Sequence, residues 1–176
     1  MVNHRPTPEQ IAARKWEIRR RYSTKAKVGK RTRSMAAIRL AEITKWYNDV
    51  HGAGAELEPC ERSIEIARIF AHHMGGLPDA PRRIMAWVLS YAPWLEHIER
   101  ERLISQVVQC PIKWSADKLA WRIRLTMEQR TRLKITTIGA IDCNREQRAQ
   151  LRKAKQAELQ KALRAKRKAE RTVNTI

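Results

Sequence analysis

The distribution of charge along the chain constrains its fold more than any other feature. Residues 1–33 contain eleven Lys and Arg against two acidic residues, residues 34–110 contain eight against ten, and residues 111–176 contain eighteen against six. Like charges at this density repel one another and disfavour burial. We therefore expect a packed core in the nearly neutral middle of the chain, flanked by two strongly basic ends.

Composition and apolar spacing predict an all-α fold. At 176 residues with 43% apolar residues, the chain has room for one domain, or for a small domain with appendages. Apolar residues recur at helical spacing, and six Trp supply much of the expected core. We expect a basic N-terminal helix and linker over 1–33, a helical core over 34–114, a helix-turn-helix-like segment packed on it over 115–142, and a basic helical tail over 143–176.

Five polar residues have the type and position of helix N-caps. Thr7, Thr126 and Asn144 each precede a Gln by three residues, which is the spacing of a capping box. Ser34 and Ser115 each stand directly before a further line of apolar residues. Each of these residues predicts the start of a helix.

Glycine, proline and β-branched residues suggest other boundaries. Gly75-Gly76 is expected to end a helix in the left-handed conformation, and Pro93 to open a helix with Ile98 on its apolar line. Val50 is expected on the core line of the helix that follows Ser34. The segment "ITTIGAID" (135–142) is rich in β-branched residues, so a short strand, a turn and a buried extended connection are all open.

The segment Arg145–Arg171 is dominated by cations. It has eleven basic and three acidic residues and contains neither Gly nor Pro, so we expect a helix at least when it is bound. Its apolar residues are mostly Ala and form no wide stripe, so this helix buries little surface. A solvated tail is the alternative, but the mutual repulsion of the cations favours a polyanionic partner that screens them.

Residues 115–135 have the outline of a helix-turn-helix. Apolar residues of 116–123 share one helical face, and a break and a second short helix follow. The sequence "LAWRIRLT" (119–126) resembles the "LAxxLGLT" core of helix-turn-helix proteins, which implies a second helix in the major groove of DNA. Arg124 stands where that family usually has Gly, and Arg130 lies on the face that should pack inward. Two ordinary helices of a bundle are the alternative.

A second resemblance covers residues 117–171. In residue order and in its basic tail, this region resembles uncharacterised basic proteins of bacterial plasmids and other mobile elements. The resemblance implies no established activity and carries over no binding residues, but it favours a role on DNA. It is carried by Thr126, Arg130, Leu133, Thr137, Ile138, Gly139 and Asp142.

Trp121 is expected to point away from the apolar face of its helix. Lys118, Arg122 and Arg124 surround it on a helical wheel. An aromatic ring among cations suits stacking on a base or sugar beside phosphate contacts. Packing of Trp121 against the linker or the tail is the alternative.

The expected nucleic-acid contacts form a central surface and two basic arms. Phosphate contacts from the arms supply affinity, while any sequence selectivity is expected from Gln129, Arg130 or Arg132. The expected residues are Lys118, Trp121, Arg122, Arg124, Gln129, Arg130, Arg132 and Lys134 in the centre, Arg145, Arg148, Arg152, Lys153 and Lys155 in the tail, and Arg19, Arg20, Arg21, Lys30, Arg31 and Arg33 near the N-terminus.

No catalytic or metal-binding motif is visible. The adjacent His72 and His73 point about 100° apart on a helix and do not chelate as an i, i+4 pair does. Cys60, Cys110 and Cys143 are far apart and fit neither a disulfide framework nor paired zinc ligands. Nucleotide-binding and hydrolase signatures are missing as well. We expect no metal, no cofactor and no enzymatic activity.

The predicted function is non-enzymatic nucleic-acid binding, with duplex DNA favoured over RNA, in replication, regulation or mobile-element maintenance. An RNA-binding or ribosome-associated protein has the same charge and would use Trp121 for stacking. An adaptor that docks its basic helix on an acidic protein partner is a further alternative. The oligomeric state is left open.

The expected location is the cytoplasm of a bacterial cell, on the nucleoid if the ligand is DNA. No apolar run has the length of a membrane helix, and the N-terminus shows no apolar region of a secretory signal. The odd number of dispersed cysteines favours a reducing compartment.

Overall fold

The protein is all-α over the residues that the structure describes. This computed structural model describes residues 6–22 and 34–173, with side chains as far as residue 166, and it contains no strand within those ranges. The predicted fold class is therefore confirmed. The helices are α1 (Pro8–Tyr22), α2 (Met35–His51), α3 (Glu61–Met74), α4 (Ala80–Tyr91), α5 (His97–Gln109), α6 (Ala116–Ile123), α7 (Met127–Arg132) and α8 (Arg145–Val173).

The predicted N-caps are confirmed by their hydrogen bonds. The backbone N–H of Ala37 donates to Oγ of Ser34, and that of Lys118 donates to Oγ of Ser115, each at 3.3 Å. Thr7, Thr126 and Asn144 form the expected reciprocal bonds with the Gln three residues later. These bonds satisfy N–H groups that have no partner within the helix, which is why short polar residues set these boundaries.

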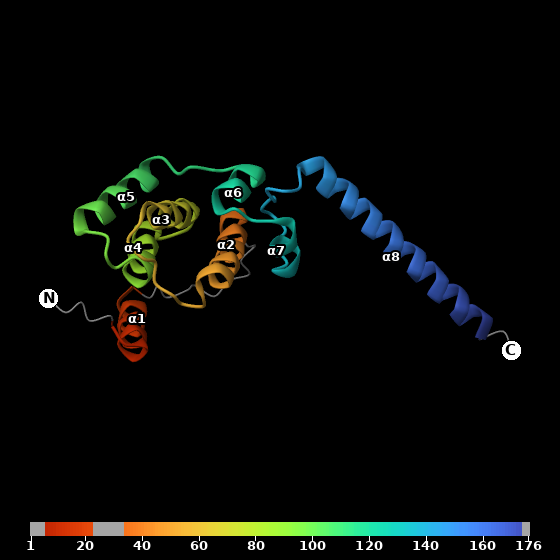
Figure 1. The fold of residues 1–176 in the computed structure, drawn as a ribbon, viewed down its shortest axis with the longest axis horizontal. Helices are drawn as coiled ribbons and strands as arrows, with labels where there is room; N and C mark the ends of the chain where they lie inside the picture. The colour runs from red at the N-terminus through yellow and green to blue at the C-terminus, as the bar shows by residue number, and fades with distance from the viewer. Residues whose placement is uncertain (1–5, 23–33, 174–176) are drawn as a thin grey trace.

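Helices α3 and α4 lie at the centre of the core. Helix α3 packs against α2, α4 and α5, and α4 also packs against α1 and α5 (Figure 1). Aromatic side chains join these helices: the ring of Phe70 stacks on Trp87 at 4.4 Å, and Trp87 stacks on Tyr91 at 5.0 Å. Tyr47 from α2 meets Phe70 edge-on at 5.7 Å. These rings pack together with fully buried aliphatic side chains such as Ile43, Ile66 and Ile84 to form the apolar core.

The six Trp divide between the core and the surface. Trp46 and Trp114 are buried, and Trp87 and Trp94 pack against the core while partly exposed. Trp16 and Trp121, by contrast, are 63% and 75% exposed. The expectation of a Trp-rich core therefore holds for four of the six rings.

Helix α1 is held to α4 and to the loop before α3 by basic side chains. Arg14 pairs with Glu56, and Lys15 donates to the carbonyl of Gly54. The Lys15 ammonium also lies 4.7 Å from the centre of the Tyr91 ring, a cation–π contact. Two of the cations of α1, Arg14 and Lys15, therefore make contacts within the protein.

The structure corrects two expectations about helix ends. Helix α3 does end at Gly75, as expected, but Gly75 has φ −56° and is not in the left-handed conformation. A Cβ at Gly75 would lie 2.7 Å from Cγ1 of Val107, so close approach of α5 explains the glycine. Pro93 does not open a helix, because Trp94 donates its indole N–H to the carbonyl of Leu57 at 2.7 Å and the turn continues to residue 96.

Two residues expected on apolar core lines are exposed. Val50 lies in the last turn of α2, and Ile98 lies in the first turn of α5, which a capping box of Glu96 and Glu99 starts. Helical spacing extends an apolar line to the end of a helix, but it does not show where the neighbouring helix stops covering it. Both side chains lie beyond that cover.

The 135–142 segment is a largely buried connection without regular structure, so the strand alternative is wrong. Ile135, Ile138 and Ala140 are buried, and the segment forms no helix or strand. Its N–H groups bond to neighbours: Gly139 donates to Ala116 and Ile141 donates to Leu125, at 3.0 and 2.9 Å. The segment therefore packs beside α6 and the turn that follows it.

The carboxylate of Glu42 holds the start of the 135–142 segment to α2. Its Oε1 accepts from the backbone N–H and hydroxyl of Thr136, at 2.6 and 2.9 Å. Its Oε2 accepts from the backbone N–H and hydroxyl of Thr137, at 3.0 and 2.5 Å. Burial raises the pKa of Glu42, but these hydrogen bonds outweigh it and bring the pKa below its ordinary value.

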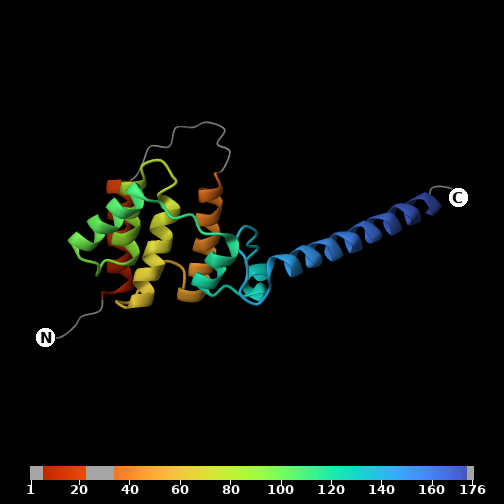
Figure 2. The same cartoon turned by 90° about the horizontal axis from the view of Figure 1, so that it is seen from above.

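Helix α8 projects away from the other helices, as both ribbon views show (Figures 1 and 2). Its side chains from residue 150 to residue 166 are exposed. Across 6–22 and 34–173, no helix is both long enough and apolar enough to span a membrane.

Candidate nucleic-acid interface

A groove separates α7 and the 135–142 segment from the first turns of α8. Its volume is about 950 Å³, and we call it the basic groove. Exposed cations on its walls outnumber the two acidic residues, Asp117 and Glu158. The exposed cations are Lys134, Arg145, Arg152 and Lys155.

Arg148 sets the position of α8 at the base of this groove. Its guanidinium pairs with Asp117 of α6 at 2.5 Å and also donates to the carbonyl of Cys143. Met127 donates its backbone N–H to Asp142 at 2.7 Å, so the residues just before α8 are also fixed to α7. Arg148 is 8% exposed, which makes it a structural contact of the groove rather than a free cation.

Arg130 is turned inward and organises the 135–142 segment. Its Nε donates to the carbonyl of Ile138 at 2.7 Å, and its Nη2 donates to the carbonyl of Thr136 at 2.9 Å. Burial, followed by repulsion from Arg148, lowers the pKa of Arg130. The unexpected cation on the inner face of α7 thus satisfies carbonyl groups of an irregular connection, as buried backbone groups require.

The other two expected sequence-reading residues also have partners within the chain. The side chain of Gln129 completes the capping box of α7. Arg132 forms two parallel hydrogen bonds with Asp49 of α2, at 2.6 and 2.7 Å, and this carboxylate raises the pKa of Arg132. Their contact with nucleic acid stays a prediction that competes with these bonds.

The helix-turn-helix resemblance is matched locally at one position. Arg124, where that family usually has Gly, has φ +54° and ψ +40°, the left-handed conformation that Gly adopts most readily. Helix α7, however, has six residues, and the chain then turns through Lys134 at φ +53°. So short a helix offers little length for reading base edges, and the resemblance itself stays a prediction.

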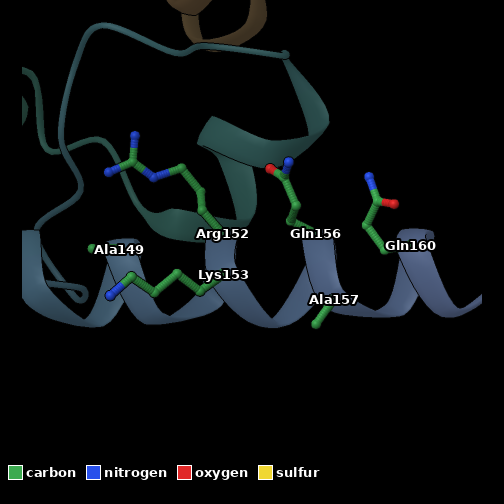
Figure 3. A pocket seen from close by; sticks show the side chains of 6 residues that line it. All are labelled: Ala149, Arg152, Lys153, Gln156, Ala157 and Gln160. Atoms are coloured by element: carbon green, nitrogen blue, oxygen red, sulfur yellow. The ribbon is translucent and has the colours of Figure 1, made fainter.

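Helix α8 presents a polar face beyond the basic groove. Arg152, Gln156 and Gln160 recur every four residues and point to the same side of the helix, as Figure 3 shows. With Ala149, Lys153 and Ala157 they line a shallow hollow of about 480 Å³. The face therefore offers amide and cationic donors in a row about 12 Å long.

Trp121 lies on the surface beside cations. It lines a hollow of about 650 Å³, which we call the Trp121 hollow, together with Arg62, Glu65, Arg122, Arg124 and Ile141. Arg122 pairs with Glu65 and lies 5.4 Å from the ring of Trp114. The alternative that Trp121 packs on another element is wrong for the described part of the chain.

The expected N-terminal arm is described only in part. Arg19, Arg20 and Arg21 are exposed on α1, where Arg20 lies 5.3 Å from the ring of Trp16. Lys30, Arg31 and Arg33 lie outside the described residues. In the centre, Lys118 is exposed on α6.

The histidines and cysteines have structural surroundings. His72 accepts from the N–H of Ile112 at 3.1 Å, His73 bonds to the carbonyl of Ile69 at 2.8 Å, and both rings contact Trp114. Burial lowers the pKa of both histidines. Among the described residues, no group of three His, Cys, Asp or Glu side chains has the geometry of a metal site.

Sequence reasoning missed the acidic residues that shape this region. Glu42, Asp49 and Asp117 hold the 135–142 segment, Arg132 and Arg148 in place, across separations of up to 95 residues. An acidic residue such as Asp117 is common in the first turn of a helix, so its type and position did not point to a distant partner. That partner, Arg148, lies 31 residues farther along the chain. Arg62 was missed because it precedes Trp121 by more than 50 residues.

No protein-family model, curated protein or solved structure matches the chain significantly.

Proposed function

We propose that the chain binds nucleic acid without catalysing a reaction, with duplex DNA ahead of RNA, through α8 and the basic groove. The observation that carries the proposal is a projecting helix whose exposed charged side chains are mostly cations. The exposed cations on this helix include Arg152, Lys153, Lys155, Lys161, Arg164 and Lys166.

The dimensions of α8 support binding in the major groove. An α-helix with its side chains is about 10–12 Å wide, which matches the major groove of B-DNA at about 12 Å. Flanking Lys and Arg then meet phosphates on both sides, and each neutralised phosphate releases counterions. Arg152, Gln156 and Gln160 would face the base edges, since Arg suits guanine and Gln suits adenine.

This proposal moves the contact surface from α7 to α8. The side chains of Gln129, Arg130 and Arg132 are engaged within the chain, so using them would break existing hydrogen bonds. Arg152, Lys153 and Lys155 of α8 are exposed and have no such hydrogen bond or ion pair among the described residues, so their use would break none. In this account α6, α7 and the 135–142 segment hold α8 at a fixed angle, and the basic groove extends the phosphate-binding surface at its base.

The proposed location follows from the proposed ligand. A protein that binds duplex DNA through phosphates would lie in the cytoplasm of a bacterial cell, on the nucleoid. Replication, regulation and maintenance of a mobile element all fit such binding equally well.

A second candidate function is docking on an acidic protein. Helix α8 exposes Leu151, Leu159 and Leu163 among its cations, and apolar side chains of this size add little to phosphate binding. An acidic helix with its own leucines would cover them and neutralise the charge. Such a partner would form a 1:1 complex whose formation depends on the leucines as much as on the cations.

Fluorescence anisotropy with a labelled duplex tests the proposed function. Replacing Arg152, Lys153 and Lys155 together by Gln should lower affinity about tenfold or more near physiological salt. The matched control replaces by Gln three exposed cations that lie outside α8, with the same change in charge. They are Arg68, Arg102 and Lys113. Equal losses in both triple variants would point to net charge alone and contradict a binding surface on α8.

A further inference from the structure

The Trp121 hollow and the basic groove lie at opposite ends of α6. Ser115, Ala116 and Asp117 line the groove, while Trp121 and Arg124 line the hollow. A helix of eight residues is about 12 Å long, which corresponds to between three and four nucleotide steps of one DNA strand. A single strand is therefore long enough to reach both.

The hollow combines an uncovered aromatic ring with two arginines, Arg62 and Arg124, that form no ion pair among the described residues. Trp121 is 75% exposed, and Ile141 beside it is also exposed. Partial burial, followed by repulsion from Arg124, lowers the pKa of Arg62, although attraction to Glu65, which also lines the hollow and pairs with Arg122, opposes this shift.

These features select one kind of ligand. A small anion would satisfy Arg62 and Arg124 but would leave the indole of Trp121 unused. An apolar ligand would cover the indole but would leave the two cations to repel one another. A nucleotide carries both a flat aromatic base and a phosphate, and a base can stack on a side chain only where its neighbouring bases do not cover it.

We propose that the Trp121 hollow binds one unpaired nucleotide of a nucleic-acid strand, with its base stacked on Trp121 and its phosphate between Arg62 and Arg124. Arg122, fixed by Glu65, borders the stacked base. The inference rests on the proposed function in one respect, that the ligand is a nucleic acid. It adds that the chain has a place for one base that is not stacked on its neighbours in the strand.

The test compares a strand that has bases with one that has none. The probes are labelled thymidine and abasic strands of about 12 nucleotides, which carry the same phosphates. The full-length chain should bind the thymidine strand about tenfold more tightly than the abasic strand. Trp121→Ala should abolish that preference, and Trp121→Phe should keep most of it. Trp16→Ala, which removes another exposed ring, is the matched control and should keep all of it.

Each other outcome decides the proposal. Equal binding of the two strands by the unmodified chain, or binding of neither, would overturn the unpaired-nucleotide site, even if a blunt duplex still binds through α8. A base preference that survives in Trp121→Ala would overturn it as well. A Trp121-dependent preference without any binding of blunt duplex would support this site and contradict duplex binding by α8. A uridine strand shows whether the preferred source is RNA or DNA.

Discussion

Arg148 and Asp117 form an ion pair, with Nη2 2.5 Å from Oδ1, that joins the first turn of α8 to the first turn of α6. Arg148 is nearly buried while Asp117 is half exposed, so the arginine depends on the contact more than the carboxylate does. The pair therefore helps to hold the base of α8 beside α6.

Arg148→Met should lower the free energy of unfolding by about 1–2 kcal/mol, because it leaves the carbonyl of Cys143 without its donor. Urea unfolding measures the change. Lys153→Met, an exposed position one turn farther along α8, should change it by less than about 0.5 kcal/mol. Equal stability of the unmodified chain and the Arg148 variant would show that the pair does not hold α8.

Gly139→Ala should weaken the same junction from the other side. A Cβ at Gly139 would lie 2.2 Å from Oδ1 of Asp117 and 3.1 Å from the carbonyl oxygen of Ala116. Either Asp117 leaves Arg148 or the 135–142 segment moves, and overpacking of this kind costs about 1–3 kcal/mol. Thermal unfolding measures the loss, and an unchanged melting temperature would contradict the close packing.

Glu42→Gln should destabilise the chain by about 2–3 kcal/mol near neutral pH. A Gln amide loses one acceptor and turns its NH₂ toward the N–H and O–H donors of Thr136 or Thr137. The folded pKa of Glu42 lies below the value of about 4.3 for an unfolded Glu. Its stabilisation is therefore present above about pH 4.3 and is lost as the pH falls through the folded pKa.

Urea unfolding of both proteins at several pH values checks this dependence. The difference in unfolding free energy between the unmodified chain and Glu42→Gln should shrink below about pH 4.3. A difference that is constant from neutral to acidic pH would mean that the charge of Glu42 does not hold the 135–142 segment.

Arg124→Gly should stabilise the chain while removing a cation from the Trp121 hollow. Arg124 has φ +54°, where a side chain costs about 1–2 kcal/mol, and the greater freedom of Gly when unfolded offsets part of the gain. We expect a net gain of about 0.5–1 kcal/mol in thermal unfolding. Lys118→Gly, in the first turn of α6, removes the same charge but should lose up to about 1 kcal/mol. A loss for Arg124→Gly would contradict backbone strain at this residue.

The features that sequence predicted well depend on neighbours along the chain. Thr7, Ser34 and Thr126 act through hydrogen bonds to residues three positions away, so type and spacing define them. The all-α class and the basic helix after Asn144 follow from periodicity, charge and the lack of helix breakers. These local signals place the helices without fixing how they pack.

The features that sequence did not predict depend on distant contacts. Arg130 looked misplaced on α7 because its acceptors, the carbonyls of Thr136 and Ile138, belong to an irregular segment that has no sequence pattern. Gly75 does end α3, but close approach of Val107 on α5, and not a left-handed conformation, explains the glycine. The expected site lost part of its free charge for the same reason, because Asp49 and Asp117 engage Arg132 and Arg148 from other helices.

The salt dependence of duplex binding tests the central claim most directly. Each phosphate contact that is lost should reduce the slope of log affinity against log salt concentration by about 0.9. The Arg152, Lys153 and Lys155 triple variant loses two phosphate contacts, those of Lys153 and Lys155, so its slope for duplex DNA should be shallower by about 2 than that of the unmodified chain. The Arg68, Arg102 and Lys113 triple variant should keep the original slope. The same slope for all three proteins would contradict duplex binding through α8.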